Sequence, residues 1–311
     1  MMIEINDPNN RLNLANKAYI ELLSLKKPFG NGRLQDMPKL LKESLKTIES
    51  YKMTSPHYEE LLDILGDILI LREEYRQKMP AVIFPVDDSL IEKKMAGGLP
   101  LIDFSAGHFD LSKPKEYFLA LLDIAEKRVP GETTDLVEKI KDDTIDFERL
   151  VLNSFYTHYD EQADEVEEDF FDLVELFLEE SLRPSMEAVA KRYTDIIPQF
   201  AWSEGYCPIC GKEPKIGQIR EGEGRFLFCN QCGFEWHFPR IKCPFCGNEE
   251  QQSLAYFTVE GDEQYRVDVC NECKRYIKIV DFRESKKDAN MDVEDIATLH
   301  LDILANEEGY E

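Results

Sequence analysis

Hydrophobic positions recur at spacings of three and four along most of the first 200 residues, the pattern of helices with one apolar face. One stripe follows Ser55-Pro56-His57, where a serine suited to capping precedes a proline suited to a first helical turn. Several consecutive stripes favour a helical bundle over isolated helical hairpins. The stripes predict helices over residues 37–48, 58–69, 117–125, 147–155 and 170–178.

Two stretches interrupt this pattern. Residues 80–114 are rich in proline and glycine, which predicts loops or short helices between two groups of longer helices. The acidic run 160–169 is followed by apolar positions from Phe170 onward. We interpret the run as the solvated start of a helix rather than as a binding tail, because carboxylates suit the positive end of a helix dipole.

The pattern changes after Trp202, where alternating residues and cysteine pairs replace the long stripes. Segments 224–228 and 265–269 predict short strands that lead into cysteine turns. Helical spacing returns at 293–304. The chain therefore reads as an α+β protein with three parts. We expect an all-helical domain at 1–200, a first four-cysteine ribbon at 201–242, and a second ribbon with a short C-terminal helix at 243–311.

All eight cysteines belong to four CxxC pairs, and a two-residue gap lets both sulfurs of a pair face one ion. Clustered cysteines of this kind are metal ligands more often than disulfides in a reducing compartment. Joining neighbouring pairs predicts two four-thiolate sites, and the near copies CPICG and CPFCG indicate a duplicated ribbon. Zinc and a single rubredoxin-like iron both remain open as the ion. The predicted ligands are Cys207, Cys210, Cys229 and Cys232 in the first site, and Cys243, Cys246, Cys270 and Cys273 in the second.

Charge and composition narrow the function classes. A net charge of −25 disfavours nucleic acid and anionic membrane surfaces as partners. No apolar run approaches the roughly 20 residues that cross a bilayer, and the N-terminus lacks the features of a signal peptide. We therefore expect a cytoplasmic protein without membrane insertion. Motifs for a nucleophile, a P-loop or a dinucleotide site are missing, so we also expect that the protein is not an enzyme.

The order CPICG, CNQCGFEWHFPRIKCPFCG and CNECKRYIKIVD resembles the formate dehydrogenase accessory family FdhE, as does the preceding Leu182-Arg183-Pro184. The resemblance implies a cytoplasmic maturation factor that binds the catalytic subunit of formate dehydrogenase without catalysing the formate reaction. It also implies a rubredoxin-like module in which the eight cysteines hold two ions, iron or zinc. Four further positions fall on the family motif and are candidates for partner contact or, alternatively, ribbon packing: Trp236, Arg240, Tyr276 and Lys278.

Two other functions compete with this interpretation. A rubredoxin-like electron carrier requires iron and a reversible redox change. A nucleic-acid-binding zinc ribbon requires a positive surface, but acidic and basic residues nearly balance between Cys207 and Lys278. We rank the accessory protein first and the nucleic-acid binder last.

Overall fold

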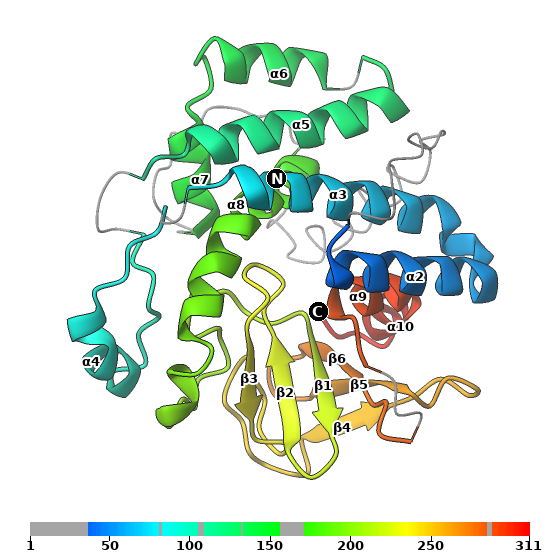
Figure 1. The fold of residues 1–311 in the computed structure, drawn as a ribbon. Coiled ribbons are helices and arrows are strands. Elements are labelled where there is room, and N and C mark those ends of the chain that lie inside the picture. Colours follow the sequence, from blue (N-terminus) through cyan, green and yellow to red (C-terminus); the bar gives the residue numbers. More distant parts are fainter. Residues whose placement is uncertain (1–36, 81–82, 105–108, 132, 156–170, 285–287) are drawn as a thin grey trace, which may run out of the picture. The chain divides into compact units, whose positions relative to one another are not determined.

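The computed structural model describes residues 37–80, 83–104, 109–131, 133–155, 171–284 and 288–311 (Figure 1). They form two compact units, and the limit between the units falls within helix α8. Unit 1 comprises residues up to Met79 together with 110–182, and unit 2 comprises 80–109 and 183–311. The acidic run 160–169, predicted to start a helix, lies outside the described residues. No helix in the described ranges is long and apolar enough to span a bilayer.

Unit 1 is helical, as the stripes predict. Helix α3 buries Leu61, Leu62 and Leu69, which belong to one of those stripes. Ser55 does not cap this helix, because Pro56–Tyr58 first form a 3₁₀ turn. The elements of unit 1 are α2 (Lys39–Thr54), η2 (Pro56–Tyr58), α3 (Glu59–Lys78), α5 (Ser112–Arg128), α6 (Thr134–Lys141), α7 (Phe147–Phe155) and the first part of α8 (Phe171–Tyr193).

The largely buried carboxylate of Glu180 joins three helices of unit 1. Arg72 of α3 donates from Nε and Nη2 to the two oxygens of Glu180 on α8, at 2.6 and 2.7 Å. The Tyr117 hydroxyl of α5 donates to Glu180 Oε1 at 2.7 Å. Arg72 and Tyr117 are both buried. Their hydrogen bonds compensate the negative charge of Glu180 and fix how the three helices pack.

Glu126 makes the stability of unit 1 depend on pH. Its carboxylate accepts hydrogen bonds from the backbone N–H groups of Gly131 and Thr133, at 2.6 and 3.0 Å. These bonds lower the pKa of Glu126 from 4.5 to about 2. A lowered pKa stabilises the fold above the unfolded value, and this stabilisation is lost as pH falls from about 4.5 toward 2. We expect Glu126→Gln to lower the urea midpoint clearly at about pH 7 and much less at about pH 3. Equal effects at both pH values would contradict this assignment.

Unit 2 is built on a six-stranded sheet of order β3-β2-β1-β6-β5-β4. All neighbouring strands are antiparallel except β1 and β6, which are parallel. The strands are β1 (Ile216–Arg220), β2 (Gly224–Phe228), β3 (Glu235–Phe238), β4 (Leu254–Phe257), β5 (Tyr265–Cys270) and β6 (Tyr276–Val280). The helices of unit 2 are η3 (Asp88–Leu90), α4 (Ile91–Ala96), the last part of α8, η5 (Ile197–Gln199), α9 (Met291–Ala297) and α10 (Leu299–Glu307).

The predicted fold class is confirmed, with two differences. The two ribbons are joined by the β1–β6 pair into one sheet, so they share a core. The expected C-terminal helix is two short helices, α9 and α10 (Figure 1). Both pack on one face of the sheet, where Leu301 and Ala305 of α10 meet Val267 and Val280 in a buried cluster.

Segment 80–109 belongs to unit 2, although its sequence reads as a break between groups of helices. The N–H groups of Leu101 and Ile102 donate to the carbonyls of Pro208 and Ile209, both at 2.9 Å. These bonds tie the segment to the first cysteine turn. The limits of the units therefore differ from the ranges 1–200, 201–242 and 243–311 expected from the sequence, because such backbone pairing leaves no mark in the hydrophobic pattern.

Candidate metal centre

Each CxxC pair lies on a turn closed by the same backbone hydrogen bond, from the residue after the second cysteine to the carbonyl of the first. All four donor residues have positive φ, a backbone conformation that favours glycine. Three of them are glycines, and the fourth is Lys274 with φ of 60°. The bonds are Gly211 to Cys207 at 2.9 Å, Gly233 to Cys229 at 2.8 Å, Gly247 to Cys243 at 3.1 Å, and Lys274 to Cys270 at 2.9 Å.

The first cysteine group consists of Cys207, Cys210, Cys229 and Cys232, whose sulfurs all lie within 4.8 Å of one another. The Cys207–Cys232 and Cys210–Cys229 sulfurs are 3.5 Å apart, and all four side chains are buried. Sulfurs placed tetrahedrally at about 2.3 Å from one ion would be about 3.8 Å apart, whereas a disulfide needs about 2.05 Å. The spacing fits a shared ion and excludes disulfides.

The second cysteine group consists of Cys243, Cys246, Cys270 and Cys273. The Cys243–Cys273 and Cys246–Cys270 sulfurs are 3.7 Å apart. Here Cys246 is exposed and Cys273 is half-buried. The structure thus brings together the same two sets of four that the spacing predicts, and it makes them unequal in exposure.

The electrostatics of both groups suit a cation. Burial raises the pKa of Cys207 and Cys232 well above the ordinary value of a thiol, so four thiolates need a positive ion there. In the second group burial acts to raise the pKa of Cys270. Donation from the Cys273 N–H and from the Asn248 amide, at 3.7 Å, opposes burial and lowers the pKa of Cys270 to about 7. Four soft sulfur donors fit zinc or iron, and ligation by these residues stays a prediction.

The difference in exposure predicts an order of metal loss. We expect a chelator to remove the ion of the second group first, and a thiol-alkylating reagent then to modify Cys246 before any cysteine of the first group. Peptide mapping by mass spectrometry during chelation measures both events. The variant Cys246→Ser provides the control, since it should lose the early alkylation. Equal labelling rates in the two groups would contradict the predicted order.

Buried Arg225 positions the turn that carries Cys243. Its Nη2 donates to the carbonyls of Pro239 and Lys242, both at 2.5 Å, and its Nη1 donates to Asp268 at 3.1 Å. A residue of the first ribbon therefore fixes the backbone that leads into the second cysteine group. Sequence reasoning missed Arg225, because the alternation of β2 only places it on a buried face.

Arg183 performs a comparable task at the first cysteine group. It donates to the backbone carbonyl of Asn230, which lies between Cys229 and Cys232. Its guanidinium also pairs with Glu187 at 3.0 Å and with Asp292 at 2.7 Å. One side chain thus joins α8, the cysteine turn and α9.

Three of the four candidate contact residues are engaged inside unit 2. Trp236 is buried and donates from Nε1 to the carbonyl of Glu204 at 3.3 Å. Lys278 is buried and pairs with Asp295 and Asp302, both at 2.7 Å. The Tyr276 hydroxyl donates to Asp302 at 2.8 Å. The Arg240 side chain is exposed, and contact of any of the four residues with a partner stays a prediction.

Two family models match this part of the chain. Residues 206–240 match the model described as "FdhE, central domain", and residues 241–311 match "FdhE, C-terminal domain". Together these ranges contain both cysteine groups.

Curated relatives carry the same name. A protein FdhE homolog of Aquifex aeolicus is 28% identical over 271 residues, covering 86% of this chain and 91% of that protein. A protein FdhE homolog of Pseudomonas aeruginosa is 38% identical over 118 residues, covering 35% of this chain and 37% of the relative. Protein FdhE of Salmonella arizonae is 33% identical over 116 residues, covering 36% of this chain and 37% of that protein. The latter two matches thus span little more than a third of those relatives.

The fold is similar to a solved structure. The crystal structure of the FdhE protein from Pseudomonas aeruginosa aligns with a TM-score of 0.65 at 20% sequence identity. The alignment covers 88% of this chain and 92% of that chain. At this identity the likeness establishes the shared fold.

Proposed function

Because this chain is an FdhE-type protein, we propose that it is an accessory factor in formate dehydrogenase maturation that binds the immature catalytic subunit. The observation that carries the proposal is the match of both family models across the two cysteine groups. In this role the protein presents a surface to its client and performs no formate chemistry itself.

The cysteine groups support a structural task within that role. Four protein thiolates complete the coordination of one ion and leave no position for substrate. The eight cysteines would hold zinc, which stabilises the fold, or iron, which also exchanges single electrons. Around them Arg183 and Arg225 tie the cysteine turns to α8, α9 and the sheet.

The proposal is tested in the host by deleting the gene and measuring formate dehydrogenase activity. We expect activity to be lost and to return with the native gene on a plasmid. Anaerobic purification of the tagged protein should also enrich the catalytic subunit over a strain that carries the tag alone. Unchanged activity in the deletion strain would refute the accessory role.

The exposure of Cys246, a predicted ligand, favours a second candidate, a rubredoxin-like electron carrier. Metal analysis of anaerobically purified protein, combined with voltammetry, separates the two roles. Fully occupied zinc protein that still restores formate dehydrogenase activity would exclude the carrier.

A further inference from the structure

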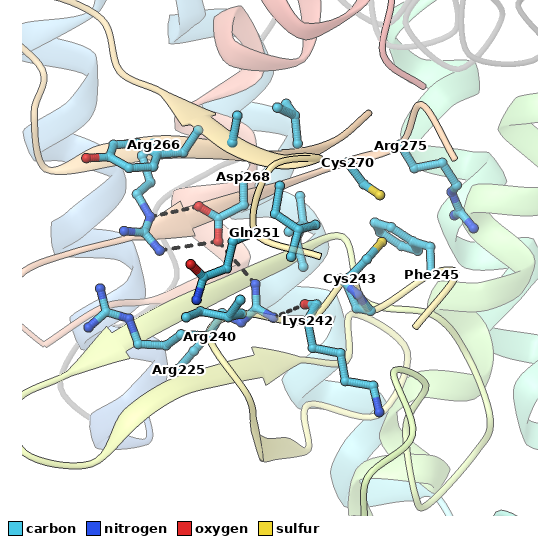
Figure 2. Close-up of a pocket in the computed structure, with 17 residues that line it drawn as sticks. Arg225, Arg240, Lys242, Cys243, Phe245, Gln251, Arg266, Asp268, Cys270 and Arg275 are labelled. Atoms are coloured by element: carbon cyan, nitrogen blue, oxygen red, sulfur yellow. Dashed lines mark hydrogen bonds and ion pairs between the residues drawn. The ribbon is translucent and has the colours of Figure 1, made fainter. Parts of the chain in front are cut away.

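A cavity of about 390 Å³ lies in unit 2 beside the second cysteine group. Its walls come from β4, β5 and β6 and from the segment 240–245 (Figure 2). Side chains alternate along β5, so Val267 packs in the cluster under α9 and α10, whereas Arg266 and Asp268 line the cavity. The cavity therefore lies on the sheet face opposite the C-terminal helices.

The lining is positively charged although the whole chain carries −25. Its walls contain one carboxylate, Asp268, which both Arg225 and Arg266 pair with. Arg240 lines the same cavity, and among the described residues it has no carboxylate partner (Figure 2). Positive charge exceeds negative charge in this cavity, so the complementary ligand is an anion.

The rim of the cavity is apolar and adjoins a sheet edge. Ile241 is 52% exposed and Tyr256 is 63% exposed, so both large side chains are open to solvent at the cavity. Tyr256 lies on β4, the last strand of the sheet, and β5 is the strand that pairs with it in the described part of the chain. An edge strand presents backbone N–H and C=O groups that an extended peptide can pair with.

We propose that this cavity and β4 form a docking site for an extended acidic segment of the client protein, an inference that rests on the proposed function. In such a segment alternate side chains point to opposite faces. The set that faces the cavity places carboxylates against Arg240, where the guanidinium fork binds them. The methylene groups of the same side chains cover Ile241 and Tyr256, which line the same cavity, while the backbone pairs with β4. The docked segment then lies against Cys243 and Cys270, which also line the cavity.

A direct binding experiment tests this site. The probe is a short fluorescein-labelled peptide that alternates Glu and Val, and its control replaces each Glu with Lys. We expect Arg240→Glu and Tyr256→Glu to weaken probe binding at least about tenfold, because each places a carboxylate where the probe needs a cation or an apolar surface. Both side chains are exposed, so the variants should fold. The matched control is Lys93→Glu, a charge reversal at an exposed position of α4 outside the cavity.

Salt and amide exchange locate the bound probe. Binding by the native protein should weaken when sodium chloride rises to about 0.5 M, where charge attraction is screened. The amides of Leu254–Phe257 should gain protection from hydrogen exchange when the probe binds. The proposal is overturned if Lys93→Glu weakens binding as much as Arg240→Glu, or if the Lys–Val peptide binds equally. Displacement of the probe by millimolar inorganic phosphate would also overturn it, since the cavity would then be a site for small anions.

Activity in the host separates this inference from the proposed function. If deletion of the gene leaves formate dehydrogenase active, the accessory role fails. If deletion abolishes activity and Arg240→Glu restores it as fully as Lys93→Glu, the accessory role stands and the docking site fails. Support for both requires restoration by Lys93→Glu and poor restoration by Arg240→Glu and Tyr256→Glu.

Discussion

Replacing Cys229 with serine is expected to reduce the metal content from two ions per chain to one and to unfold the first ribbon. A hydroxyl is a poor ligand for zinc or iron, and the other three thiols of this group are buried, so they cannot be solvated instead. Structural four-thiolate sites supply about 10–16 kcal/mol of binding free energy to small folds. Metal analysis and limited proteolysis of β1–β3 measure the two losses.

Cys246→Ser is the matched comparison, because Cys246 is exposed whereas Cys229 is buried. This variant should also lose one ion, but β1–β3 should keep their resistance to protease. Retention of two ions by Cys229→Ser would contradict ligation by this cysteine. Equal proteolysis of β1–β3 in both variants would show that the first ribbon does not depend on its own ion.

Replacing Lys278 with methionine is expected to destabilise unit 2 by about 3–5 kcal/mol, because it leaves two carboxylates without their buried cation. Burial alone would lower the pKa of Lys278, but Asp295 and Asp302 outweigh burial and raise the pKa above its ordinary 10.5. A raised pKa means that the stabilisation is complete below about 10.5 and is lost only as pH rises beyond it. Urea unfolding at neutral pH therefore measures the full effect.

A double variant separates loss of charge pairing from loss of packing. The Asp302 side chain is only 14% exposed, and desolvation raises its pKa, so its charge is costly once Lys278 is gone. We expect Lys278→Met with Asp302→Asn to recover part of the lost stability, since replacing a whole buried ionic cluster costs less than removing one partner. Lys93→Met serves as the surface control. If Lys278→Met lowers the free energy of unfolding by less than about 1 kcal/mol, the pair contributes no more than an ordinary surface ion pair and the prediction is wrong.

The cysteine groups and the helices are the parts that the sequence predicts best, because both follow from local spacing. The CxxC turns form within five residues, and glycine at Gly211, Gly233 and Gly247 marks the positive φ that closes them. The stripe that ends at Leu69 likewise needs only helical periodicity to be recognised.

The features missed from the sequence depend on contacts between distant segments. Leu101 bonds to Pro208 through its backbone, which any residue except proline can do. In the sequence Arg225 is one polar position in a short strand. Its hydrogen bonds to Lys242 and Asp268 depend on the fold and cannot be predicted from the strand alone. Lys278 looks like a surface charge until α9 and α10 fold over it with Asp295 and Asp302.

The parallel pairing of β1 with β6 has a consequence for synthesis on the ribosome. β2 and β3 follow β1 directly, so the first ribbon can form early, but β6 emerges only after β4 and β5 of the second ribbon have been translated. Until then the free edge of β1 is a site for wrong strand pairing, and loop closure over this distance slows its completion. An ion held by the first cysteine group, as we propose, would fold the first ribbon before the second exists, and a chain released before β6 pairs would keep an open, aggregation-prone edge.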